Sequence, residues 1–145
     1  FGPDPLVKKE LMVNGRAWRV SCVSVGNPHC ITLVPDTAAI DIQTIGPRFE
    51  HHAAFPAGVN TEFIQQKSPT HLKMRVWERG SGETLACGTG ASASVAACVA
   101  LGVCPANTDV TVELLGGNLV IRVDENWRID MTGPAHTTFC GQVEV

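Results

Sequence analysis

The sequence lacks tyrosine, basic runs and long hydrophobic stretches. Aromatic side chains make up 6% of its 145 residues and charged ones 17%, and 11 basic against 14 acidic residues give a formal net charge of −3. Without basic residues clustered or interleaved with aromatics, no nucleic-acid partner is expected. The longest apolar segment, 91–101, is too short to span a bilayer, so no membrane partner is expected either.

The cysteines also lack the spacing of a disulfide framework or a zinc site. There are six, at positions 22, 30, 87, 98, 104 and 140, and no CxxC pair occurs. A chain with 44% hydrophobic residues can build a core without disulfides. The nearest metal-like cluster, His29-Cys30 with His51-His52, matches no zinc pattern. We therefore expect reduced cysteines, no metal and a cytoplasmic location.

The length predicts a single domain over residues 1–145, with no internal repeat or linker. No signal peptide is visible, and because the chain starts with Phe1 rather than Met we expect a fragment or a processed product.

Alternating apolar residues predict a strand-rich chain. Asn14-Gly15 favours a type I′ turn between the first two strands, and 36–52 favours two short helical turns broken at Gly46-Pro47. Residues 1–5 are expected to be an irregular entry. The expected strands are 11–13, 17–25, 30–34, 59–65, 71–78, 110–114, 119–123, 127–131 and 141–145.

One helix is predicted at 91–101. It carries no charge and is apolar nearly all round, which is typical of a helix buried on every side. Gly102 suits a left-handed C-terminal cap, and Pro105 prevents continuation. Such a helix in a strand-rich chain predicts an α+β fold, with a mixed sheet or half-barrel wrapped around one central helix.

The start of this helix is the candidate for chemistry. Cys87-Gly88-Thr89-Gly90 places a thiol beside free backbone N–H groups, which favour negative charge. They can lower the thiol pKa or hold a carboxylate or phosphate. The alternative is that Cys87 is a small buried hydrophobe and the glycines only make the turn. Neither GxGxxG nor GxxxxGK[ST] is present, so nucleotide binding is weakly supported.

Two charged residues close the strand before this turn. Alternation over 71–78 points Glu78 to the apolar side, which is unusual for a carboxylate without a function. Arg79 can pair with Glu83, or its planar fork can grip a substrate carboxylate.

Four segments resemble the diaminopimelate epimerase family. They are VSVGNPHCITLV from Val23, FPAGVNTEFI from Phe55, VWERGSGETLACGTGA from Val76 and MTGPA from Met131. The resemblance spans almost the whole chain but only the C-terminal half of the family's enzyme. That family has two similar halves, each a mixed β structure around a central helix, and each half contributes one catalytic cysteine.

The resemblance implies a set of site residues. It makes Cys87 the acid/base, Glu78 a catalytic and ammonium-binding group, and His29 a further catalytic residue. The substrate-binding residues that it implies are Asn27, Asn60, Glu78, Arg79, Gly88 and Thr89. For Asn27 and Asn60, a purely structural turn role is the alternative.

The resemblance further implies interconversion of LL- and meso-diaminopimelate without pyridoxal phosphate, metal or other cofactor. The family's second cysteine lies in a Cys-Gly-Asn-Gly helix start that is absent here. We therefore expect this chain to need an N-terminal half as partner and to be inactive alone; a homo-oligomer is an open alternative. The rival functions are a proline racemase-like enzyme, a carboxylate-binding module and a structural half-barrel.

Overall fold

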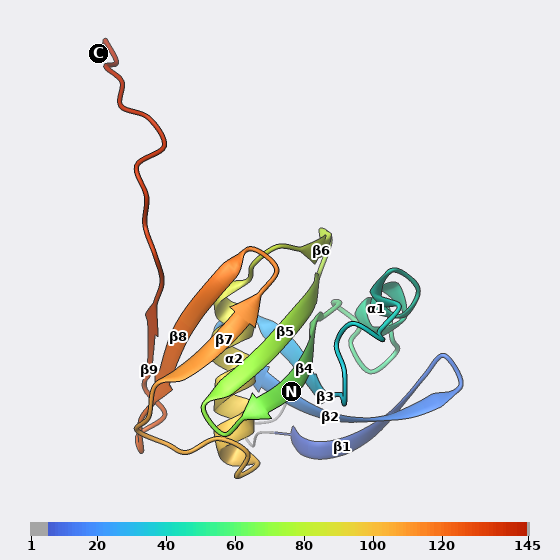
Figure 1. Ribbon diagram of the computed structural model, residues 1–145. Helices are drawn as coiled ribbons and strands as arrows, with labels where there is room; N and C mark the ends of the chain where they lie inside the picture. Colours follow the sequence, from blue (N-terminus) through green and yellow to red (C-terminus); the bar gives the residue numbers. More distant parts are fainter. Residues whose placement is uncertain (1–5, 145) are drawn as a thin grey trace.

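The computed structural model describes residues 6–144, which form a mixed sheet with a helix on each side of it (Figure 1). The predicted irregular entry at 1–5 lies outside the described residues. The strands are β1 (Leu6–Val13), β2 (Arg16–Ser24), β3 (Pro28–Leu33), β4 (Asn60–Ser68), β5 (His71–Glu78), β6 (Gly82–Thr84), β7 (Val110–Leu114), β8 (Gly117–Val123) and β9 (Ile129–Thr132). The helices are α1 (Ile42–Glu50) and α2 (Gly88–Ala100).

The order of strands explains where the helices lie. The strands follow one another across the sheet in the order β1-β2-β3-β4-β5-β7-β8-β9, and the short β6 pairs with β5. Pairs β3/β4 and β5/β7 are parallel, whereas the others are antiparallel. Parallel neighbours need a crossover connection, and here α1 lies in the first crossover and α2 in the second.

The sheet curls around α2, as predicted. The helix contacts β2, β3 and β4 as well as β8 and β9, so both ends of the strand order reach it (Figure 1). From Gly90 to Cys98 every residue except Ser92 is buried. Small side chains allow this close approach, and Gly102, at φ +70°, ends the helical segment as expected. The α+β half-barrel around a central helix is therefore confirmed.

Two apolar cores occupy the two faces of the sheet. One surrounds α2; the other lies beneath α1 and includes Trp18, Phe49 and Phe63. Strand β4 serves both cores, because alternate side chains point to opposite faces: Ile64 faces α2, and Phe63 faces α1. Both side chains are fully buried.

The prediction of two broken turns over 36–52 was wrong, since α1 runs unbroken from Ile42 to Glu50 with Pro47 inside it. The Asp41 side chain caps its start by accepting from Thr44 N at 3.3 Å. Gly46 is a packing residue: a Cβ there would lie 2.3 Å from the Trp77 ring. Burial of one face of α1 against β4 and β5 offsets the hydrogen bond that proline removes.

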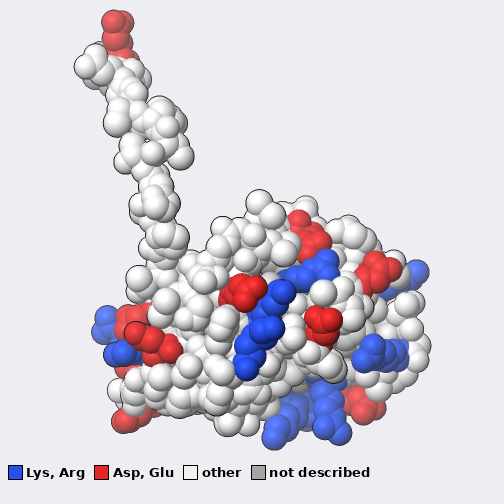
Figure 2. All heavy atoms as spheres, viewed as in Figure 1, with Lys and Arg blue, Asp and Glu red and all other residues white. Residues whose placement is uncertain are grey.

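The chain end also differs from prediction. Residues 133–144 leave β9 as an exposed extended segment, and no strand forms at 141–144; Val145 lies outside the described residues. A strand requires a neighbour to pair with, and this segment runs away from the sheet (Figure 1). Figure 2 shows it nearly free of charged atoms until its tip, while charges of both signs mix over the visible face of the body.

Within residues 6–144, neither helix combines the length and apolarity needed to cross a membrane.

Candidate active site

The predicted site residues gather where the start of α2 meets one end of the sheet. Strands β3 and β4 run parallel, with His29 beside Asn60, and β5 runs antiparallel to β4, with Trp77 beside Thr61. The first residues of β3 and β4 and the last residue of β5 therefore share one edge. Segments more than thirty positions apart in sequence meet there only because the sheet brings them together.

Cys87 is the N-cap of α2. Its backbone is extended, at φ −144° and ψ 105°, and its Sγ accepts the Gly90 N–H at 3.3 Å. Burial raises the pKa of the Cys87 thiol and outweighs the lowering by Thr89 and by the Gly90 N–H. The helix terminus, which the sequence suggested could lower this pKa, does not dominate, because Cys87 is only 8% exposed.

The raised pKa of the Cys87 thiol leads to a prediction about its rate of alkylation. Only the thiolate reacts with iodoacetamide, so alkylation of Cys87 should be slow at pH 7 and rise about tenfold per pH unit until the raised pKa is passed. Mass spectrometry of this chain after timed labelling gives the rate at each thiol. The exposed Cys140 is the internal reference. Faster labelling of Cys87 than of Cys140 at pH 7 would contradict the raised pKa.

A series of side-chain contacts links Cys87 to the loop before β3. The Cys87 Sγ lies 3.6 Å from Thr89 Oγ1, and Asn27 Nδ2 donates to the same oxygen at 3.3 Å. The other end of the amide, Oδ1, lies 3.0 Å from His29 Nε2. The structure therefore brings three predicted residues, Asn27, His29 and Thr89, into one hydrogen-bonded group beside the thiol.

This group ends on a residue that the sequence analysis did not select. His29 Nδ1 lies 2.6 Å from Glu62 Oε1, and both side chains are fully buried. The signal was available: Glu62 lies two positions after Asn60 on the same face of a strand, so a charged side chain points inward there.

Asn60 and Arg79 are held mainly by the chain itself. Asn60 donates to the Pro28 carbonyl and accepts from Arg79 N, both at 2.9 Å, and it is 5% exposed. The exposed Arg79 guanidinium donates to the Ala57 carbonyl at 3.0 Å. The alternative ion pair between Arg79 and Glu83 does not form, because Glu83 pairs with Arg75 at 2.7 Å.

Glu78 ends β5 on the α2 side of the sheet, following Val76 and Met74 into that core as the alternation predicts. Its Oε1 accepts from the Thr84 hydroxyl across the β5–β6 hairpin. Glu78 is half-buried and so remains accessible beside the helix start.

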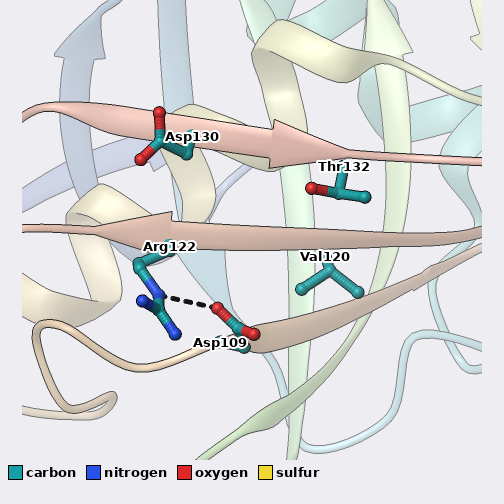
Figure 3. A pocket seen from close by; sticks show the side chains of 5 residues that line it. All are labelled: Asp109, Val120, Arg122, Asp130 and Thr132. Atoms are coloured by element: carbon teal, nitrogen blue, oxygen red, sulfur yellow. Dashed lines mark hydrogen bonds and ion pairs between the residues drawn. The ribbon is translucent and has the colours of Figure 1, made fainter.

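A separate depression lies on the other face of the sheet. Its volume is about 490 Å³, and it is lined by residues of β8 and β9 and by Asp109, which precedes β7 and pairs with Arg122 (Figure 3). Alternation along β9 turns Asp130 and Thr132 into this depression, whereas Met131 lies on the α2 side near Gly88. The depression is therefore distinct from the group around Cys87. Among the described residues, no cluster of His, Cys, Asp or Glu has the arrangement of a metal site.

Solved structures show which class of fold this is. A hydroxyproline epimerase from Agrobacterium vitis, solved with bound trans-4-hydroxy-L-proline, matches 83% of the chain with a TM-score of 0.60 and 14% identity, covering 42% of that protein. A PhzF-family phenazine biosynthesis protein from Bacillus anthracis matches 88% of the chain with a TM-score of 0.51 and 22% identity, covering 37% of that protein. The chain shares the fold of these two proteins.

Sequence comparison identifies the family within this class. The diaminopimelate epimerase family model matches residues 21–138. Curated diaminopimelate epimerases of Acaryochloris marina and Nostoc punctiforme are 55% and 54% identical over 99% and 97% of the chain. The chain belongs to the diaminopimelate epimerase family. It spans about half the length of these relatives, 50% in both cases.

Proposed function

We propose that this chain is one half of a cofactor-independent epimerase that interconverts LL- and meso-diaminopimelate, with Cys87 as one of two acid/base groups. The observation that carries the proposal is the position of Cys87: a thiol at the N-cap of α2, contacting Thr89, in a chain of the diaminopimelate epimerase family. Inversion moves one proton off the α-carbon and delivers one to its other face. Cys87 serves one face, and a cysteine of the other half serves the opposite face.

The helix start suits the substrate carboxylate next to the reacting carbon. Gly90 N–H donates to Cys87 Sγ and Ala91 N–H to the Cys87 carbonyl. In the described part of the chain, this leaves the N–H groups of Gly88 and Thr89 as donors for a ligand. A carboxylate there sits at the positive end of the helix dipole, which stabilises the charge that develops when the α-proton leaves. The raised pKa of Cys87 keeps its thiol protonated at neutral pH, ready to donate.

The remaining predicted residues bind the two ends of the substrate. Half-buried Glu78 binds the ammonium at the reacting end, where its second oxygen remains for the ligand. Asn27 and Arg79 bind the distal amino-acid end. Asn60 contributes one lone pair of Oδ1 at most, because its amide already bridges Pro28 and Arg79. A grip on the distal end separates this site from a proline racemase-like one, whose substrate has no such end.

Exposed apolar side chains beside the helix start support the need for a second half. Leu85, Leu115 and Met131 are 67%, 54% and 54% exposed. Leu85 and Leu115 are close neighbours, since the Leu85 carbonyl accepts from Gly116 N at 2.7 Å, and Met131 lies over Gly88. This rim is the surface that the missing half covers, excluding water from the site. The isolated chain is accordingly inactive.

The test is deuterium incorporation at the α-carbon of diaminopimelate in heavy water. This chain is assayed alone, then with the part of the Acaryochloris marina relative that it does not match, and then joined to that part in one polypeptide. We expect exchange and epimerisation only in the last two samples. Turnover by the chain alone would overturn the two-half proposal. Exchange on proline but not on diaminopimelate by the joined protein would favour the racemase alternative.

A further inference from the structure

Glu62 is a buried carboxylate for which the proposed function has no role. Both it and His29 are 0% exposed, and its Oε1 is 2.6 Å from His29 Nδ1. Within residues 6–144, Glu62 Oε2 has no hydrogen-bond partner. Burying a charged pair usually stabilises a protein less than a well-packed apolar pair would. The buried contact between Glu62 and His29 therefore calls for an explanation other than stability.

Counting protons along the contacts shows what Glu62 does. Asn27 Nδ2 can only donate, and it donates to Thr89, so Asn27 Oδ1 must accept. The hydrogen bond to this oxygen comes from His29 Nε2, which must therefore carry a proton. Only one further proton lies between His29 Nδ1 and Glu62 Oε1. It sits either on the carboxyl group, leaving a neutral imidazole, or on the ring, making an ion pair.

The surroundings favour the neutral pair. A carboxylate spreads its charge over both oxygens and needs partners for each, but Oε2 has none among the described residues. Burial raises the pKa of Glu62, and the hydrogen bond to His29 opposes this only in part. Position adds to the argument, because a Cβ on Gly90 would lie 2.7 Å from Glu62 Oε1 and 3.1 Å from Cys87 Sγ. A neutral Glu62 carboxyl group places no negative charge next to the acid/base thiol of Cys87.

Resting on the proposed function, we propose that Glu62 is a positioning residue of the epimerase site: its carboxyl group donates to His29 Nδ1 and fixes the imidazole with Nε2 protonated. That imidazole orients the Asn27 amide, so that Nδ2 faces Thr89 and the thiol beyond it. Glu62 touches no substrate and acts through His29. Without Glu62, the imidazole can adopt its other tautomer, in which Nε2 carries no proton. The Asn27 amide then loses the hydrogen bond from His29 that orients it.

The variants follow from this geometry. In Glu62→Gln the side-chain NH2 replaces the carboxyl O–H as donor to Nδ1, so the tautomer is preserved. In Glu62→Leu the donor is lost. The matched control is Thr61→Val. Thr61 is the neighbouring residue and is fully buried, valine has nearly the same shape as threonine, and the Thr61 hydroxyl has no partner in the described chain. All variants are made in the complete protein, which is this chain joined in one polypeptide to the unmatched part of the Acaryochloris marina relative. The protein is labelled with [15N]histidine, and the His29 signals are identified by their loss in His29→Gln.

We expect wild type and Glu62→Gln to share one pattern, Nε2 protonated and Nδ1 not, and to have similar kcat. Glu62→Leu should lose the pattern and lower kcat about 10–100-fold, the effect that loss of a hydrogen-bonding partner has at metal-bound histidines. KM should rise as well, because the Asn27 amide, which binds the distal end of the substrate, is no longer oriented. Thr61→Val should match wild type in both measurements.

Two results would overturn the proposal. If both ring nitrogens are protonated in wild type and Glu62→Gln is as impaired as Glu62→Leu, the pair is ionic. If Glu62→Leu keeps the wild-type pattern and kcat, Glu62 has no positioning role. Should Glu62→Leu fail to fold, the spectra of wild type and Glu62→Gln still show whether the pair of Glu62 and His29 is neutral or ionic. A complete protein without turnover on diaminopimelate would refute the proposed function, while the nitrogen pattern would still report whether Glu62 holds His29.

Discussion

Replacing Cys87 by alanine in the complete protein is expected to lower kcat by about 10²–10⁴-fold, the usual contribution of a positioned acid/base group. Both directions of the reaction should fail together, since Cys87 gives a proton in one direction and takes it in the other. Cys87→Ser separates chemistry from structure. Serine is a good N-cap, so it retains the bond from Gly90 N–H, but a hydroxyl is a far weaker acid than a thiol. We expect this variant to fold normally and to be inactive.

The matched control for these variants is Cys140→Ala, which removes an exposed thiol from the tail. Activity should remain close to wild type. The measurement is the rate of α-deuterium incorporation, together with binding of diaminopimelate by calorimetry. If Cys87→Ala retained more than a tenth of the wild-type rate, Cys87 would not be the acid/base. If the wild-type protein gave no exchange and Cys87→Ser bound diaminopimelate as well as the wild type does, the carboxylate-binding alternative would be the better one.

Replacing Phe63 by alanine is expected to lower the free energy of unfolding by about 3–5 kcal/mol. Phe63 is fully buried in the core under α1, where its ring makes edge contacts with Trp18 and Phe49 at 5.9 and 5.7 Å between centroids. Both partners come from other elements, so a cavity there cannot be filled by moving one side chain. Since typical domains have about 5–15 kcal/mol of stability, this variant should be close to unfolding.

Urea unfolding followed by tryptophan fluorescence measures this loss, with the midpoint as the readout. The control is Leu33→Ala on the neighbouring β3, which is 41% exposed and should shift the midpoint far less. Phe63 faces away from α2, so the folded fraction of Phe63→Ala should keep the slow alkylation of Cys87. Equal shifts for Phe63→Ala and Leu33→Ala would contradict the assignment of Phe63 to the core.

Local patterns predicted much of the framework. The Asn14-Gly15 hairpin forms with both residues at positive φ, and β5 spans His71–Glu78 as the alternation indicated. The uncharged helix is α2, buried nearly all round. Each of these features depends on residues close together in the chain, for which periodicity and turn chemistry are sufficient.

Elements that depend on distant partners were predicted less well. Helix α1 continues through Gly46-Pro47 because the Trp77 ring, from β5, fills the space that a side chain at Gly46 would occupy. Strand β6 exists because β5 pairs with it, and the segment 141–144 is no strand because none of residues 6–144 pairs with it. In each case the deciding contact comes from far along the sequence, or is missing.

The sequence by itself determined the family, the half-barrel around a central helix and the selection of Cys87, Asn27, His29 and Glu78 as candidate site residues, because motifs and periodicity are local properties of the chain. Only the tertiary structure decided that Glu62 lies against His29, that Asn60 is held by the chain itself, and that burial raises the pKa of Cys87. Contact between β3, β4 and α2 and the loss of water around them arise on folding, so neither can be read from the order of residues.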